Sequence, residues 1–213
     1  MLKSTFKLCL VTHQQHHSLD TYEHFIRLAV LGGVTMVQLR NKGEPGAVRE
    51  LALNLIGLLR PLHVPLIIND DVDFAKEVDA DGVHLGQSDR PPEEARRILG
   101  IDKIIGLSIE TLEQLEQANQ LSCIDYIGAS AVFPSHTKKD CKTIWGLEGL
   151  KKIVAMSKHP VVAIGGINTG NAQDVMKTGA AGVAVVSAIH DHHQPDVVAM
   201  QLIQEINKGE HYV

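Results

Sequence analysis

Short apolar segments alternate with helical segments along the whole chain, and no other feature of the sequence constrains the fold as strongly. Strands that are apolar throughout are typical of parallel sheets buried on both faces. Eight strand-helix units allow either a doubly wound sheet or a closed barrel. Their number within 213 residues, with no break in composition, favours a single-domain (β/α)8 TIM barrel spanning residues 1–213. The expected strands are 6–12, 34–39, 64–68, 82–85, 103–108, 124–129, 161–164 and 182–186. The expected helices are 22–31 with Asp20 as its N-cap, 48–59, 74–78, one opening at 91–94, 112–119, 147–156, 171–178 and 196–206.

The composition argues against several classes of protein. The formal net charge of −5 disfavours general affinity for nucleic acid, which needs a basic face. No stretch approaches the roughly 18 apolar residues of a membrane-spanning helix, so we expect no membrane partner. Three cysteines show neither a disulfide framework nor metal-ligand spacing, which indicates free thiols and a cytoplasmic location. A homo-oligomer is left open.

Two acidic residues follow neighbouring expected strands. Asp70 comes after strand 64–68 and Asp89 after strand 82–85, so the two should lie side by side at the carboxyl ends of parallel strands. Two carboxylates, completed by phosphate oxygens and water, suit Mg²⁺. The alternative for an acid at such a position is a helix cap, and Asp71 is assigned to the start of the next helix.

Glycines and a small hydroxyl follow the last two expected strands. Gly165 and Gly166 come directly after strand 161–164, and Ser187 follows strand 182–186. Loops after strands seven and eight of a TIM barrel often bind phosphate through backbone N–H groups. An isolated glycine pair is more often a tight turn, but its combination with Ser187 favours a phosphate site.

A second anion site is expected at the end of strand 34–39. Arg40 and Lys42 follow this strand and can neutralise a diphosphate, with Gln38 and Asn69 adding neutral hydrogen bonds. The alternative for Arg40 is a structural ion pair. Two anion sites on one rim suggest either two phosphorylated substrates that are joined or one bisphosphate.

The ordered set of motifs resembles the thiamine-phosphate synthase family over nearly the whole chain. The motifs are Gln38-Leu39-Arg40-Asn41-Lys42, Ile68-Asn69-Asp70, the segments 81–89, 125–128 and 132–140, Ala163-Ile164-Gly165-Gly166-Ile167 and the segment 182–189. The resemblance implies a Mg²⁺-dependent transferase. It would join 4-amino-2-methyl-5-(diphosphooxymethyl)pyrimidine to a phosphorylated hydroxyethyl-thiazole, releasing thiamine phosphate and diphosphate.

The resemblance also implies roles for individual residues. Arg40, Lys42 and Lys138 would stabilise the charge that develops on diphosphate as it leaves before the thiazole attacks. Asp70 and Asp89 would bind Mg²⁺. The pyrimidine diphosphate would be contacted by Gln38, Arg40, Lys42, Asn69, Ser108 and Lys138, with Leu39 and Asn41 also counted as substrate-binding residues. The thiazole phosphate would be held by Ser135, Thr137, Gly166, Val186 and Ser187.

The sequence departs from the family pattern at three places. Ser135 stands where threonine is usual, Ser130-Ala131 where Gly-Pro is usual, and Glu110 where relatives commonly carry histidine. Thiazole tautomerases of the same fold use a histidine near that last position and lack much of the cationic set, so the synthase is favoured over the tautomerase. A non-catalytic sensor of phosphorylated ligands is a further alternative. His84 is expected to be a hydrogen-bonded barrel histidine with no catalytic role.

Overall fold

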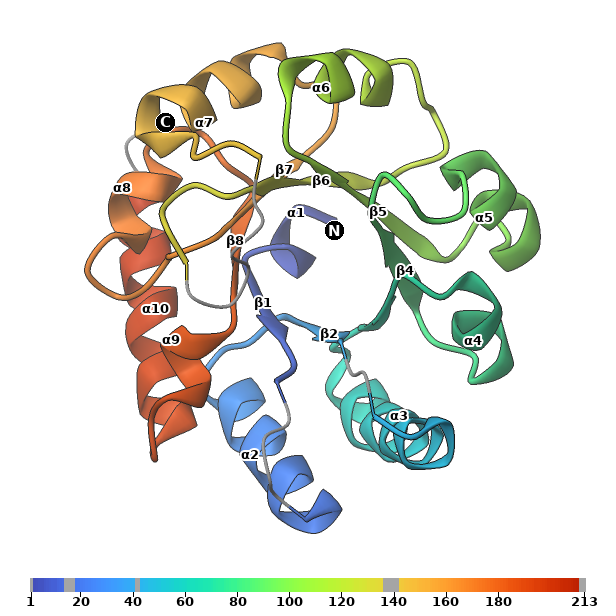
Figure 1. Ribbon diagram of the computed structural model, residues 1–213. Coiled ribbons are helices and arrows are strands. Elements are labelled where there is room, and N and C mark those ends of the chain that lie inside the picture. Colours follow the sequence, from blue (N-terminus) through green and yellow to red (C-terminus); the bar gives the residue numbers. More distant parts are fainter. Residues whose placement is uncertain (1, 14–17, 41–42, 136–141, 211–213) are drawn as a thin grey trace.

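Eight parallel strands close into a barrel in chain order, as the ring in Figure 1 shows. The computed structural model describes residues 2–13, 18–40, 43–135 and 142–210. Cys9 of the first strand pairs with both Met36 of the second and Ala184 of the last, which closes the ring. The TIM barrel expected from the sequence is therefore confirmed. The strands are β1 (Leu8–Val11), β2 (Met36–Leu39), β3 (Leu66–Asn69), β4 (Gly82–Leu85), β5 (Ile104–Ile109), β6 (Tyr126–Ser130), β7 (Val161–Ile164) and β8 (Gly182–Val185).

The helices that connect the strands lie around the outside of the barrel (Figure 1). They pack apolar faces onto the strands, and the large core cluster joins the outward-facing strand residues to the buried faces of these helices. Among the described residues, no helix is both long and apolar enough to cross a membrane. The helices are α1 (Leu2–Thr5), α2 (Leu19–Leu31), α3 (Pro45–Leu59), the 3-10 helix η1 (Arg60–Leu62), α4 (Val72–Glu77), α5 (Pro92–Leu99), α6 (Leu112–Ala118), α7 (Gly146–Met156), α8 (Ala172–Met176), α9 (Ser187–His190) and α10 (Pro195–Glu210).

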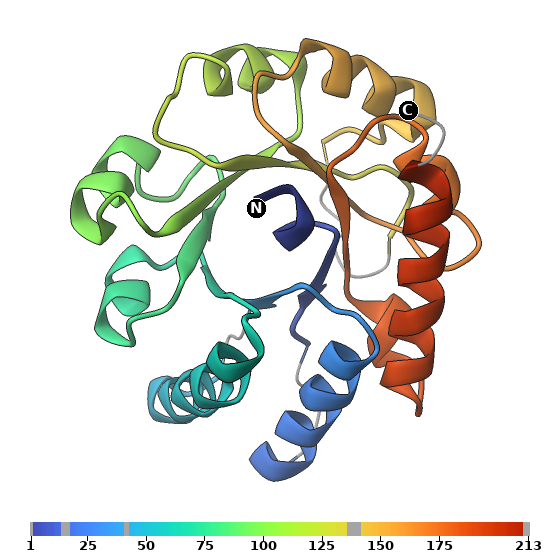
Figure 2. The ribbon, with the colours of Figure 1, turned by 180° about the vertical axis from the view of Figure 1, so that it is seen from behind.

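A smaller apolar cluster fills the lower interior of the barrel. Phe6, immediately before β1, is fully buried, and its ring centroid lies 4.8 Å from that of Tyr126. Both ribbon views place α1 inside the ring of strands (Figures 1 and 2). Because α1 and Phe6 precede β1, they close the barrel at the amino ends of its strands. The cluster is Phe6, Cys9, Val11, Met36, Ile67, Tyr126, Val162 and Ala184.

The structure differs from the sequence-based prediction at the cap of α2 and at the end of β8. Ser18, and not Asp20, is the N-cap of α2, because the Ser18 side chain accepts a hydrogen bond from the backbone N–H of Thr21. The expectation for Asp20 was wrong, and this residue lies inside the first turn, where an acid also complements the helix dipole. The last strand ends at Val185, one residue early, because the chain turns there toward the short helix α9.

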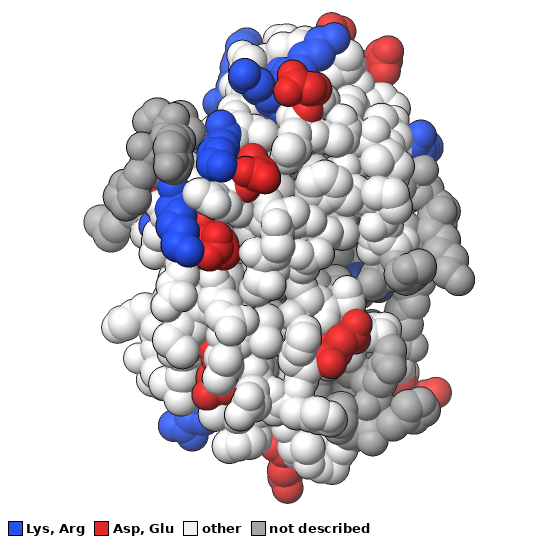
Figure 3. Space-filling view, turned by 90° about the vertical axis from the view of Figure 1, so that its left-hand side faces the viewer, with Lys and Arg blue, Asp and Glu red and all other residues white. Residues whose placement is uncertain are grey.

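Charged side chains of both signs lie together on the outer surface. On the face that Figure 3 shows, lysine and arginine side chains are interspersed with acidic ones, and uncharged surface lies between these groups. Some ion pairs of the molecule lie within one helix, such as Lys208 with Glu205 in α10 at 2.5 Å. Exposed pairs of this kind contribute little to stability.

Candidate active site

A cavity of about 730 Å³ opens at the carboxyl ends of the strands and continues down to the small apolar cluster. Leu39 does not line it, because its side chain is buried in the outer core. Asn41, Lys42, Thr137 and Lys138 lie outside the described residues. The cavity brings together the other residues expected from the sequence, which are Gln38, Arg40, Asn69, Asp70, Asp89, Ser108, Ser135, Gly166, Val186 and Ser187.

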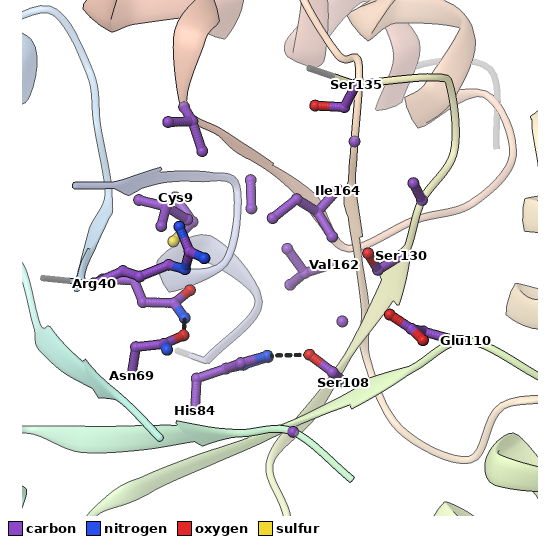
Figure 4. A pocket seen from close by; sticks show the side chains of 18 of the residues that line it. Cys9, Arg40, Asn69, His84, Ser108, Glu110, Ser130, Ser135, Val162 and Ile164 are labelled. Carbon is purple, nitrogen blue, oxygen red and sulfur yellow. Dashed lines mark hydrogen bonds between the residues drawn. The ribbon is translucent and has the colours of Figure 1, made fainter. Parts of the chain in front are cut away.

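Gln38 and Asn69 form one polar unit on the wall of the cavity. Gln38 is the third residue of β2, and Asn69 ends β3. The Nε2 of Gln38 donates a 2.6 Å hydrogen bond to Oδ1 of Asn69, drawn as a dashed line in Figure 4. Gln38 is only 6% exposed, so this bond satisfies an amide that is almost removed from water. Because the Oδ1 atom of Asn69 accepts this bond, Asn69 retains its Nδ2 group as a donor for a ligand.

Arg40 is fixed to the rim through its backbone. The hydroxyl of Thr12, at the end of β1, accepts from the Arg40 N–H at 2.9 Å and donates to the Arg40 carbonyl at 3.3 Å. The Arg40 side chain lines the cavity (Figure 4). Among the residues that the structure describes, no carboxylate forms an ion pair with Arg40. This cation is therefore placed to meet an anionic ligand.

Asp70 and Asp89 reach the same cavity from consecutive strand ends. Asp70 has a left-handed backbone (φ 69°), and its N–H donates to the His84 carbonyl at 2.8 Å. One oxygen of Asp89 accepts from the Gly86 N–H at 2.7 Å, which leaves the other for a ligand. Asp71 instead caps α4 through the Phe74 N–H, as predicted from the sequence.

This donor set fits Mg²⁺. The described residues contain no group of three or more histidine, cysteine or acidic side chains that could hold a metal ion. A cation held by Asp70 and Asp89 must therefore complete its shell with ligand oxygens and water. Mg²⁺ characteristically binds in this way, through one or two carboxylates, phosphate oxygens and retained water.

The glycine pair after β7 shapes the opposite wall. Gly165 (φ 106°) and Gly166 (φ 65°) both adopt backbone conformations that favour glycine. A Cβ on Gly166 would lie 2.6 Å from the Pro134 carbonyl oxygen, so no side chain fits there. Nδ2 of Asn171 donates to the Gly166 carbonyl at 3.0 Å and holds the turn. Backbone is thus exposed to the cavity, which Ser187, the first residue of α9, also lines.

Several further side chains line the cavity, and the sequence indicated no specific role for them. Gln87 and Glu110 follow β4 and β5, so the same strand-end signal that marks Asp70 also marks them. Lys142 lies on the long segment between β6 and α7, where no periodic pattern indicates the direction of a side chain. Burial raises the pKa of the Cys9 thiol, on the cavity floor, to about 12. Cys9 therefore stays protonated and is no nucleophile near neutral pH.

The comparisons with known proteins agree with this geometry. A family model described as thiamine monophosphate synthase matches residues 8–189. The thiamine-phosphate synthase of Chlamydia caviae is 43% identical over 212 residues, which are 98% of this chain and 99% of that protein. The one from Vibrio parahaemolyticus is 49% identical over 201 residues, covering 94% and 98%. The solved structure of thiamine phosphate pyrophosphorylase from Pyrococcus furiosus has a TM-score of 0.88 and 38% identity, covering 99% of this chain and all of that one.

Proposed function

The chain belongs to the thiamine monophosphate synthase family, and from this membership we propose how its cavity performs the family's reaction. The protein is an enzyme of thiamine biosynthesis. It transfers the (4-amino-2-methylpyrimidin-5-yl)methyl group of 4-amino-2-methyl-5-(diphosphooxymethyl)pyrimidine to a phosphorylated hydroxyethyl-thiazole. The products are thiamine phosphate and diphosphate. Its cytoplasmic location stays a prediction.

The pyrimidine diphosphate binds on the β2–β4 side of the cavity. Arg40 and the Nδ2 group of Asn69 donate hydrogen bonds to its phosphate oxygens, and Lys42 and Lys138 add positive charge. Asp70 and Asp89 hold Mg²⁺, which when bound neutralises charge on the leaving diphosphate. Groups already oriented toward a position where charge develops lower the barrier without having to reorganise.

The thiazole phosphate binds on the β7–β8 side. The backbone at Gly166, Val186 and Ser187 lines the cavity here and would donate N–H groups to the phosphate. Ser135 and Thr137 supply hydroxyl donors from the segment after β6. Arg40, Asn69, Asp70 and Asp89 line the same cavity as Gly166, Val186 and Ser187, and this observation supports the proposal of two anion subsites.

The reaction proceeds by departure of diphosphate, followed by attack of the thiazole nitrogen on the pyrimidine methyl cation. The C–O bond to diphosphate breaks with its electron pair, and the nitrogen lone pair forms the new C–N bond. No side-chain nucleophile takes part, in keeping with the protonated state of Cys9. Holding both substrates at near-attack distance contributes the remainder of the rate enhancement.

A coupled assay tests the function. The purified chain is incubated with both substrates and Mg²⁺, and thiamine phosphate and diphosphate are quantified together. Equal amounts of both products are expected, with a strong loss of rate in Arg40→Gln. Absence of diphosphate release from folded protein would overturn the proposal. Isomerisation of the thiazole without coupling would identify a tautomerase instead.

A further inference from the structure

Three side chains from neighbouring strands form a hydrogen-bonded row in the wall of the cavity. His84 of β4 is in register with Gly106 of β5, and Gly106 is in register with Tyr126 of β6. The His84 Nδ1 lies 2.8 Å from the Tyr126 hydroxyl, and its Nε2 lies 2.8 Å from the Ser108 hydroxyl. Figure 4 shows the second of these bonds, with Ser108 at the cavity surface. The row thus leads from the barrel interior to the cavity surface at Ser108.

Two glycines leave the space that this row occupies. A Cβ on Gly106 would lie 2.2 Å from Cζ of Tyr126 and 2.5 Å from Nδ1 of His84. A Cβ on Gly128 would lie 3.1 Å from Cε1 of His84. Any side chain at Gly106 would therefore displace the imidazole or the phenol. The geometry of the row therefore depends on the absence of a side chain at Gly106, whereas a Cβ on Gly128 would require the imidazole to shift by only a few tenths of an ångström.

Burial determines where the protons lie. Tyr126 is 2% exposed, and burial raises the pKa of its hydroxyl well above the ordinary value, so the hydroxyl keeps its proton. Within the described part of the chain, the only hydrogen-bond partner of that hydroxyl is Nδ1 of His84. A buried O–H must donate to avoid the cost of an unsatisfied polar group. Nδ1 is therefore assigned as the acceptor, which places the imidazole proton on Nε2.

The direction of the next bond follows. Nε2–H of His84 donates to the Ser108 oxygen. No other described residue forms a hydrogen bond with the Ser108 hydroxyl, so its own proton is directed to the cavity. We propose that Tyr126 and His84 are positioning residues that fix the Ser108 hydroxyl as a hydrogen-bond donor to a ring nitrogen of the aminopyrimidine. This inference rests on the proposed function, in which Ser108 contacts the pyrimidine.

The proposal explains how the cavity can distinguish the two kinds of polar group on this ring. A ring nitrogen accepts a hydrogen bond, whereas the exocyclic amine mainly donates. A serine that is free to rotate serves either, but one fixed as a donor selects the nitrogen. The bond orients the ring in the ground state and in the transition state alike, so it contributes to uniform binding and not to kcat.

Nitrogen NMR of the ¹⁵N-histidine-labelled full chain tests the proton placement without any turnover. His84 is assigned by the signals lost in His84→Gln. We expect a neutral imidazole with a protonated Nε2 and an unprotonated Nδ1. A proton on Nδ1 would overturn the proposal even if the synthase activity is normal. If the expected tautomer is found in a chain without synthase activity, the proton placement stands and the proposed function fails separately.

Kinetics of Tyr126→Phe test the role. The variant keeps the aromatic ring against Phe6 but removes the donor to Nδ1, so the serine loses its fixed direction. We expect KM for the pyrimidine diphosphate to rise about tenfold, the loss of roughly one hydrogen bond, with kcat within about twofold and KM for the thiazole phosphate unchanged. A fall in kcat at constant KM would overturn the proposal.

A double-mutant cycle separates positioning from a structural effect. If Tyr126 acts through Ser108, then Tyr126→Phe should have almost no further effect on KM in a Ser108→Ala background. An equal, additive effect in both backgrounds would show that Tyr126 acts independently of Ser108 and would refute the relay. Thermal unfolding of all four proteins controls for loss of folded enzyme.

Discussion

The side-chain amide of Gln38 donates to the carbonyl oxygen of Asn69 at 2.6 Å and thereby joins the carboxyl ends of β2 and β3. The bond fixes which end of the Asn69 amide faces the ligand, because the carbonyl is occupied and the Nδ2 group remains. A neutral residue pair thus presents a donor next to the carboxylate of Asp70.

Asn69→Asp should weaken binding of the pyrimidine diphosphate. The aspartate keeps an acceptor for Gln38 but replaces the donor with a negative oxygen beside Asp70. A hydrogen bond to a charged group contributes about 1.5–3 kcal/mol, so KM for this substrate should rise by at least about tenfold. Steady-state kinetics at saturating Mg²⁺ measure this. Asn69→Ala should show a smaller increase, and an unchanged KM in the aspartate variant would contradict the proposed contact.

Asp89→Asn should lose at least about a hundredfold in kcat/KM, the scale of losing one group that stabilises developing charge. The asparagine carbonyl can still accept from the Gly86 N–H, so the melting temperature should stay close to that of the wild type. Asp71→Asn is the matched control, because it removes a neighbouring charge while keeping the cap of α4. It should retain activity within about twofold. Titration of activity with Mg²⁺ should show a weaker apparent affinity only in the Asp89 variant, and similar Mg²⁺ curves for both would refute the metal assignment.

Gly166→Ala should destabilise the protein and weaken binding of the thiazole phosphate. The added Cβ meets the Pro134 carbonyl oxygen and the Phe133 Cβ in a left-handed backbone, which predicts a loss of about 1–3 kcal/mol. Urea unfolding and KM for the thiazole phosphate measure the two effects. Gly57→Ala is the comparison, because a Cβ there meets nothing within 4 Å on α3 and should stabilise the helix by about 0.5–1 kcal/mol. Equal stability of the two variants would be incompatible with the described turn.

Arg96→Lys should reduce stability without changing kcat. Arg96 donates to Asp125 at 2.7 Å and to four backbone carbonyls around the amino ends of β5 and β6, and its side chain is 15% exposed. A lysine cannot reproduce this fork of donors, so the free energy of unfolding should fall by about 2–3 kcal/mol. Arg97→Lys, on the same helix but 77% exposed, should change it by less than about 0.5 kcal/mol. A comparable loss in both, measured by urea unfolding, would contradict this account.

Most of the barrel was predictable from the sequence because its strands are short and bounded by polar residues or glycine. The expected strands 82–85 and 161–164 coincide with β4 and β7. The helices α1 and α9 were not predicted, since four residues are too few for periodicity to be recognised. Ser18 was missed as the cap of α2 because Asp20, two positions later, has an equally suitable side chain for that role.

The rim of the site was predictable for the same reason as the strands, since a residue directly after an apolar segment must lie at the carboxyl edge. The hydrogen-bonded row of His84, Ser108 and Tyr126 was not predictable from the sequence. Its members are far apart in the sequence, and their contact depends on the register between β4, β5 and β6. That register is a property of the closed barrel, and no local pattern encodes it.

The space left by Gly106 has a consequence for how this lineage of sequences can change. A methyl group added at residue 106 would overlap both the imidazole of His84 and the phenol of Tyr126. A larger residue at 106 therefore becomes acceptable only after both aromatic rings have been replaced by smaller side chains. The order of substitutions is thus restricted, and mutational libraries that vary residue 106 alone should return glycine, whereas libraries that vary 84, 106 and 126 together should recover coupled triplets.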